Sequence, residues 1–169
     1  MTNQLNIALR AVEPTDLDLL FELENSETHW EVTNTRIPFS KHTLKNYLES
    51  VQDIYADRQL RMVIELGGIP CGLMDWFDFD PFHQRAGLGI VVAEPYRNGG
   101  VARSAVEKAI IFSQKNLGLR LLFCNILAEN VPSIRLFEGA GFVECGIKKN
   151  WHRSPDGDIK DEKMFLFNC

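Results

Sequence analysis

The chain has 169 residues, of which 45% are hydrophobic and 24% are charged, and its formal net charge is −5. This length and composition predict a single domain over residues 1–169 and exclude a fibrous or low-complexity chain. The acidic balance argues against non-specific nucleic-acid binding and fits cationic partners better. No run of 18 apolar residues and no basic leader is present, so we expect no membrane span and a cytoplasmic location.

The four cysteines, at positions 71, 124, 145 and 169, share no spacing typical of a metal site. Cys71 and Cys124 lie in apolar runs, which favours buried, reduced thiols. We therefore expect no bound metal.

The first half of the chain is predicted to alternate strands and helices. Strands are expected over residues 6–12, 60–66 and 69–77, the last two joined by a glycine turn at 67–68. One helix starts at 14–16, and a second runs from Ser40 to about Tyr55 with Leu44, Tyr47, Leu48 and Val51 facing inward. Residues 27–39 read as irregular and residues 78–84 as a loop.

The chain's central stretch, residues 86–104, reads as strand, glycine loop and helix. The strand covers 88–92, Glu94-Pro95 ends it, and a helix with one apolar face runs from Val101 to about Asn116. The free N–H groups of residues 97–100 lie at the positive end of this helix, where they form a binding place for phosphate or pyrophosphate. The loop matches neither GxxxxGK[ST] nor GxGxxG.

The last third is predicted to add a strand at 119–127 that is buried on both faces, and a short helix at 132–138. Two further strands, 142–153 and 163–167, flank a turn at 154–157. The order β-α-α-β-β-β-α-β-α-β-β predicts a mixed α/β domain around one sheet.

Two motifs carry a family resemblance. Residues 97–102, R-N-G-G-V-A, resemble the [QR]-x-x-G-x-[GA] signature of the GNAT superfamily of N-acyltransferases. Residues 130–142, NVPSIRLFEGAGF, resemble the N-x-x-[SA]-x-x-x-[YF]-x-x-x-G-F block of the same superfamily. The resemblance covers nearly the whole chain and is most specific over 85–142. Within the superfamily, residues 83–102 look most like the RimJ/RimL and spermidine N-acetyltransferase branch.

This resemblance implies an α/β (α+β) GNAT fold. Its central sheet would be mixed and mostly antiparallel, with about seven strands splayed between the fourth and fifth, and about four flanking helices. It also implies acetyl-CoA as cosubstrate. Backbone N–H groups at the end of the fourth strand would donate hydrogen bonds to the thioester carbonyl as it becomes an oxyanion. The implied cofactor-binding residues are Ile90, Val91, Val92, Arg97, Asn98, Gly99, Gly100, Val101, Ala102, Arg103, Asn130 and Ser133.

The catalytic groups depart from the family pattern. Gly87 and Leu88 stand where many members carry a glutamate base on the fourth strand. The candidates to deprotonate the amine are His83, Asp75, Asp78, Asp80, Glu31 and His29. We favour His83, because imidazole changes protonation near neutral pH. Phe137 replaces the usual tyrosine acid. That leaves Ser133 or solvent to protonate the departing thiolate.

The resemblance thus implies transfer of an acetyl group from acetyl-CoA to a primary amine by direct attack in a ternary complex. The acceptor stays open between a polyamine, a protein N-terminus and a small amine, and the family allows a homodimer. The alternative is a binding module or sensor that holds acetyl-CoA without turnover, which the absent tyrosine and glutamate would favour.

Overall fold

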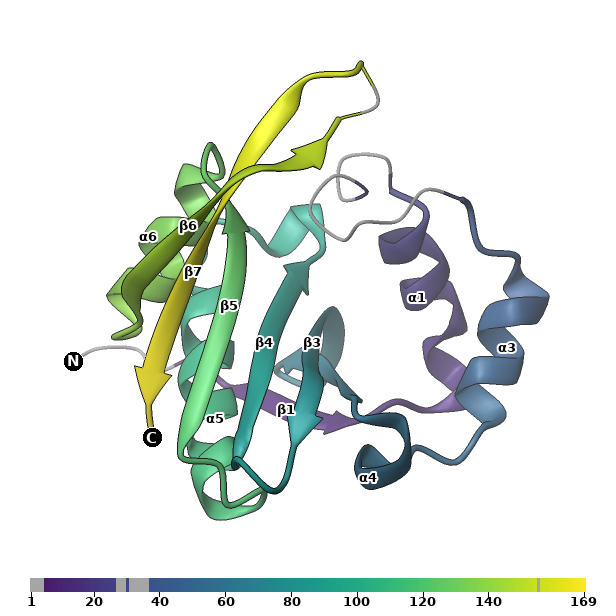
Figure 1. Ribbon diagram of the computed structural model, residues 1–169. Coiled ribbons are helices and arrows are strands. Elements are labelled where there is room, and N and C mark those ends of the chain that lie inside the picture. Colours follow the sequence, from purple (N-terminus) through teal and green to yellow (C-terminus); the bar gives the residue numbers. More distant parts are fainter. Residues whose placement is uncertain (1–4, 27–29, 31–36, 155) are drawn as a thin grey trace.

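The computed structural model describes residues 5–26, 30, 37–154 and 156–169. Its seven strands form one sheet in the order β1-β2-β3-β4-β5-β7-β6 (Figure 1). The strands are β1 Ile7–Ala11, β2 Leu60–Leu66, β3 Ile69–Asp80, β4 Arg85–Val92, β5 Leu121–Leu127, β6 Val143–Arg153 and β7 Ile159–Asn168. All neighbouring strands are antiparallel except β4 and β5, which are parallel. The predicted mixed, mostly antiparallel sheet is confirmed.

Helices cover both faces of this sheet. They are α1 Leu17–Glu24, α3 Lys41–Glu49, α4 Ile54–Asp57, α5 Val101–Lys115 and α6 Val131–Gly139, with 3-10 turns η1 Pro14–Asp16 and η2 Glu94–Tyr96. Successive strand residues point to opposite faces. Accordingly Val63 and Leu73 pack in the core under α1 and α3, whereas Ile64 and Met74 belong to the larger core under α5 and α6. Figure 1 shows α1 and α3 side by side, away from α5 and α6.

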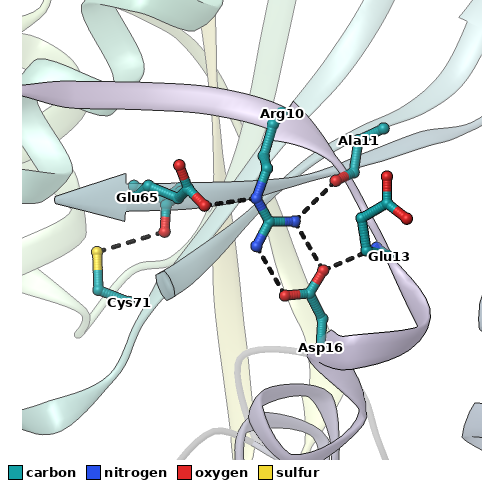
Figure 2. A network of polar contacts seen from close by, with 7 residues as sticks. Arg10, Ala11, Glu13, Asp16, Glu65 and Cys71 are labelled. Atoms are coloured by element: carbon teal, nitrogen blue, oxygen red, sulfur yellow. Dashed lines mark hydrogen bonds and ion pairs between the residues drawn. The ribbon is translucent and has the colours of Figure 1, made fainter. Parts of the chain in front are cut away.

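An ion-pair network fastens the start of α1 to the edge of the sheet (Figure 2). The Arg10 guanidinium of β1 donates to both carboxylate oxygens of Asp16, at 2.7 and 2.8 Å, and its Nε contacts Glu65 of β2. Burial acts to raise the pKa of Asp16, but Arg10 and the Glu13 amide, 2.7 Å away, outweigh it and lower that pKa below its ordinary value. The network fixes the direction of α1, whose last residue is Glu24.

The predicted helix over 40–55 is two helices, so that prediction was wrong in length. Ser50 adopts an extended backbone after α3, and its hydroxyl donates to the carbonyl of Tyr47. The Asp53 carboxylate then accepts the N–H groups of Tyr55 and Ala56 and starts α4. Val51 therefore lies in the connection and is 89% exposed rather than inward.

Several strand limits also differ from expectation. β4 begins at Arg85 instead of residue 88. β3 continues to Asp80 through a register shift after Phe77, and β7 begins at Ile159 instead of residue 163. β5 begins at Leu121 and buries alternate residues more deeply, rather than both faces equally. Cys71 and Cys124 are buried free thiols, as predicted. In the described part of the chain, no helix combines the length and apolar composition of a membrane span.

Candidate functional site

Strands β4 and β5 separate soon after they pair. Their ladder joins Arg85–Gly87 with Leu121–Phe123 and goes no further. The strands therefore part after Gly87, well before Glu94-Pro95, where the sequence predicted the fourth strand to end. At the last paired step, the rings of Phe77 and Phe123 meet edge to face, with centroids 5.5 Å apart. A Cβ on Gly87 would lie 2.2 Å from the Phe77 ring, so this aromatic pair requires glycine there.

A cavity of about 410 Å³ occupies the opening between the two strands. Its strand walls are Leu88–Val91 of β4 and Cys124–Leu127 of β5. The remaining lining residues are Leu23, Glu24, Arg61, Leu73, Asp75, Phe77, Asn130, Ser133, Phe137, His152 and Glu162. Leu73 belongs to the core under α1, and Phe137 to the core under α5 and α6. The cavity therefore extends through the sheet and offers a surface to each face.

The glycine loop leads into α5 beside this opening. Gly100 is the N-cap of α5 with a left-handed φ of 82°, and Asn98 also has a positive φ of 62°. The first N–H groups of a helix, here from Val101 onward, have no intrahelical acceptor and lie at its positive end. Arg97 Nε donates to the carbonyl of Val92 at 2.9 Å, which ties the loop to the end of β4. The predicted loop residues 97–103 thus lie together.

Helix α6 supplies the second predicted motif. Asn130 is its N-cap, and its Oδ1 accepts the N–H of Ser133 at 3.2 Å. Phe137 is 4% exposed and packs edge to face on Phe142, with centroids 5.0 Å apart. Arg103 of α5 pairs with Glu107 at 2.6 Å and lies where a side chain on Gly139 would stand. Asn130, Ser133 and Phe137 all line the cavity.

An arginine bridges two carboxylates on the α1 side of the cavity. Arg61 of β2 donates from Nε and Nη2 to the two oxygens of Asp75, at 2.6 and 2.9 Å, and from Nη1 to Glu24 of α1. Burial acts to lower the pKa of Arg61, but the two carboxylates raise it well above its ordinary value. Tyr47 lies beside this cluster with the Arg61 guanidinium 5.9 Å from its ring centre, and burial raises the pKa of its hydroxyl.

A second polar cluster joins β5, β6 and β7. Glu162 is 7% exposed, accepts from Lys148 Nζ at 2.7 Å and pairs with His152 Nε2 at 2.5 Å. Lys148 also donates to Asn125 Oδ1 at 3.3 Å. Burial acts to raise the pKa of Glu162, but the bonds from Lys148 and His152 outweigh it and lower that pKa. Glu162 therefore stays ionised at neutral pH.

Of the candidate bases proposed from the sequence, His83, Asp78 and Asp80 lie away from the cavity. His83 lies exposed on the β3–β4 turn, where its N–H donates to Asp80 at 2.9 Å and its carbonyl accepts from Arg120. This turn is at the opposite end of β4 from the glycine loop, and His83, Asp78 and Asp80 do not line the cavity. His29 and Glu31 lie outside the described residues. Asp75 is the candidate that the structure brings to the cavity.

Three lining residues were missed as candidates: Glu24, His152 and Glu162. Glu162 fell between the predicted turn at 154–157 and the predicted strand at 163–167, so it was assigned to no element. Cys124 also lines the cavity, but burial raises the pKa of its thiol and keeps it protonated. In the described ranges, no group of three His, Cys, Asp or Glu side chains is arranged to hold a metal ion.

A parallel strand pair that parts beside the glycine loop and the start of a helix is the arrangement that the GNAT resemblance implied. A family model described as "Acetyltransferase (GNAT) domain" matches residues 6–143, and the chain belongs to this family. It is an acetyl-CoA-dependent N-acetyltransferase, as the sequence resemblance implied.

The chain is similar over most of its length to proteins named as N-acetyltransferases. The chain is 27% identical to the spermidine N(1)-acetyltransferase of Vibrio cholerae over 150 residues, covering 86% of this chain and 83% of that protein. It is 26% identical to the prophage-derived N-acetyltransferase YokL of Bacillus subtilis over 141 residues, covering 83% and 78%. A crystal structure of spermidine N-acetyltransferase from Vibrio cholerae with CoA and spermine shares the fold, with a TM-score of 0.86, 24% identity and coverage of 96% and 95%.

Proposed function

We propose that this enzyme acetylates a primary amine of a cationic, polyamine-like acceptor by direct attack in a ternary complex. The observation that carries this proposal is the charge of the cavity. Three carboxylates line it, from Glu24, Asp75 and Glu162, against two cations, the lining guanidinium of Arg61 and the ammonium of Lys148 that pairs with Glu162. Excess negative charge in a partly enclosed cavity attracts and orients ammonium groups. The relative named a spermidine N(1)-acetyltransferase supports the same acceptor class.

Acetyl-CoA would approach from the side of α5 and α6. The N–H groups at the start of α5 are suited to its pyrophosphate, because they have no intrahelical acceptor and lie at the positive end of the helix dipole. The N–H of Arg97 instead donates to the carbonyl of Glu94 at 3.1 Å. The charges of Arg97 and Arg103 would add to this attraction. Ser133 and Asn130, at the start of α6, would lie beside the pantetheine arm where it enters the cavity.

The backbone geometry of β4 indicates which of the N–H groups of residues 90–92 would polarise the thioester carbonyl. The N–H of Ala93 donates to Cys71 of β3 at 2.9 Å. Because N–H directions alternate along a strand, the N–H of Val91 also faces β3, whereas those of Ile90 and Val92 face the opening toward β5. We therefore assign oxyanion stabilisation to Ile90 and Val92, and a ladder role to Val91. Donors fixed before the reaction stabilise a developing oxyanion most.

The test is a panel of amines incubated with acetyl-CoA, with release of free thiol as the readout. The panel covers polyamines, peptides with a free N-terminus, amino acids and aminoglycosides. We expect the highest kcat/KM with polyamines. Glu24→Gln should raise KM about tenfold for a polyamine and much less for a monoamine, because one carboxylate interaction is lost.

Two results would contradict this proposal. A preference for monoamines or peptides over polyamines would overturn the acceptor class. Retained CoA binding with no thiol release from any amine would instead support the module that binds acetyl-CoA without turnover. Calorimetry with CoA separates this second result from a misfolded preparation.

A further inference from the structure

The cavity contains a histidine–carboxylate pair, formed by His152 and one of the three lining carboxylates, Glu162. His152 of β6 and Glu162 of β7 both line the cavity, and the side chains are 18% and 9% exposed. Their Nε2 and Oε2 atoms are 2.5 Å apart. The pair comes from the hairpin β6–β7, whereas the cofactor loop and the Arg61 cluster come from other elements. It is thus an independent feature of the acceptor end of the site.

The partners of Glu162 fix the hydrogen on the imidazole ring. Lys148 occupies Oε1 at 2.7 Å, so the carboxylate is held as an anion between an ammonium and the ring. An ionised carboxylate only accepts hydrogen bonds, and therefore Nε2 of His152 must carry the hydrogen. In a neutral ring, this leaves Nδ1 as the acceptor of a further proton. A carboxylate that orients an imidazole in this way also stabilises the imidazolium once it forms.

Other charged groups around the pair are already engaged with one another. Lys160, opposite His152 in the β6–β7 register, pairs with Glu129. From β5, Asn125 receives Lys148. Across the cavity, Arg61 contacts both oxygens of Asp75 and one of Glu24. Protonating Asp75 would disrupt a two-pronged ion pair, which makes it a poorer base than the ring of His152.

We propose that His152, held by Glu162, accepts the proton of the acceptor's ammonium, directly or through one water. This proposal rests on the proposed function. The ammonium gives its first proton to Nδ1 of His152, and the neutral amine nitrogen then forms a bond to the acetyl carbon. The carbon–sulfur bond breaks, and the second proton of the nitrogen passes through Ser133 or a water to the CoA thiolate. His152 afterwards releases the first proton to solvent. Glu162 is a positioning residue in this scheme and Lys148 fixes its charge.

The experiment compares His152→Gln with wild type on the best polyamine of the panel, as a function of pH. A lost general base costs roughly a hundredfold in kcat/KM near neutral pH. The deficit should shrink to a few-fold toward about pH 10, where the amine loses its proton to solvent. With a weakly basic amine that is neutral at pH 7, kcat/KM of His152→Gln should be only a few-fold below wild type at every pH. Glu162→Gln should lose less activity than His152→Gln, because the ring remains in place but loses the carboxylate that orients it.

Two histidine variants complete the set. His42→Gln is the matched control, because His42 lies exposed on α3 and should leave activity unchanged. CoA affinity and melting temperature of His152→Gln should match wild type. An equal deficit at all pH values and with both amines overturns the proposal, as does a larger loss in His83→Gln. Wild type without turnover overturns the proposed function as well, whereas turnover with an unaffected His152→Gln overturns this inference alone.

Discussion

Replacing Gly87 by alanine should destabilise the protein at the point where β4 and β5 part. The new Cβ would lie 2.2, 2.4 and 2.6 Å from three atoms of the Phe77 ring, so the ring must move by about 1 Å or more to reach ordinary contact. Overpacking of this kind costs about 1–3 kcal/mol, and disturbing the Phe77–Phe123 pair adds about 0.5–1.5 kcal/mol. We expect a loss of about 2–4 kcal/mol in the free energy of unfolding.

Urea unfolding and thermal melts measure this loss directly. In a domain of this size, about 2–4 kcal/mol corresponds to a melting temperature lower by roughly 5–15 °C. Gly89→Ala is the matched control two residues along β4, because its Cβ would meet Phe77 at an ordinary 3.7 Å. Adding Phe77→Leu to Gly87→Ala should recover part of the loss, as a coupling of roughly 1–3 kcal/mol. Equal effects at both glycines, or strict additivity in the double variant, would refute the reasoning.

Three further predictions concern the loop, the fold and the leaving group. Gly100→Asp should weaken CoA binding at least about thirtyfold by calorimetry, while Gly118→Asp, at a similar positive φ, should not; unchanged affinity would contradict the loop assignment. Asp16→Asn should cost about 1–3 kcal/mol at neutral pH, and the difference from wild type should vanish as pH falls below 3.8, because the folded pKa of Asp16 lies below that value; a constant difference would count against the Arg10 network. Ser133→Ala should lower kcat several-fold and Phe137→Tyr should change it less than about tenfold; a rise of a hundredfold in the tyrosine variant would show that a missing acid limits the enzyme.

The elements to which we assign cofactor binding were predictable because their signals are local. A left-handed glycine before a helix, at Gly100, and a side-chain cap, at Asn130, act within a few residues of sequence. The same holds for the strand that precedes them. Local caps also explain the main error in the fold, since apolar spacing continued through Val51 while Ser50 and Asp53 ended one helix and began another.

The acceptor half depends on contacts that sequence periodicity does not encode. Arg61 pairs with Asp75 because the β2–β3 register places them opposite one another. Glu24, the last residue of α1, contacts the same guanidinium. His152 and Glu162 meet across a hairpin whose register shifts between Lys148 and His152. A strict alternation of residues would have misplaced one partner relative to the other. The favoured base, His83, was chosen by residue type alone.

The position of β7 has a consequence for how the molecule assembles. β7 follows β6 in sequence, yet it lies between β5 and β6 in the sheet. Strand β6 therefore joins the sheet through β7, and the β6–β7 hairpin docks on β5 as one unit across a long stretch of chain, a slow kind of pairing. Until the hairpin docks, the cavity lacks the side chains of His152 and Glu162, whereas the glycine loop, α5 and Asp75 belong to elements that precede the hairpin in the chain.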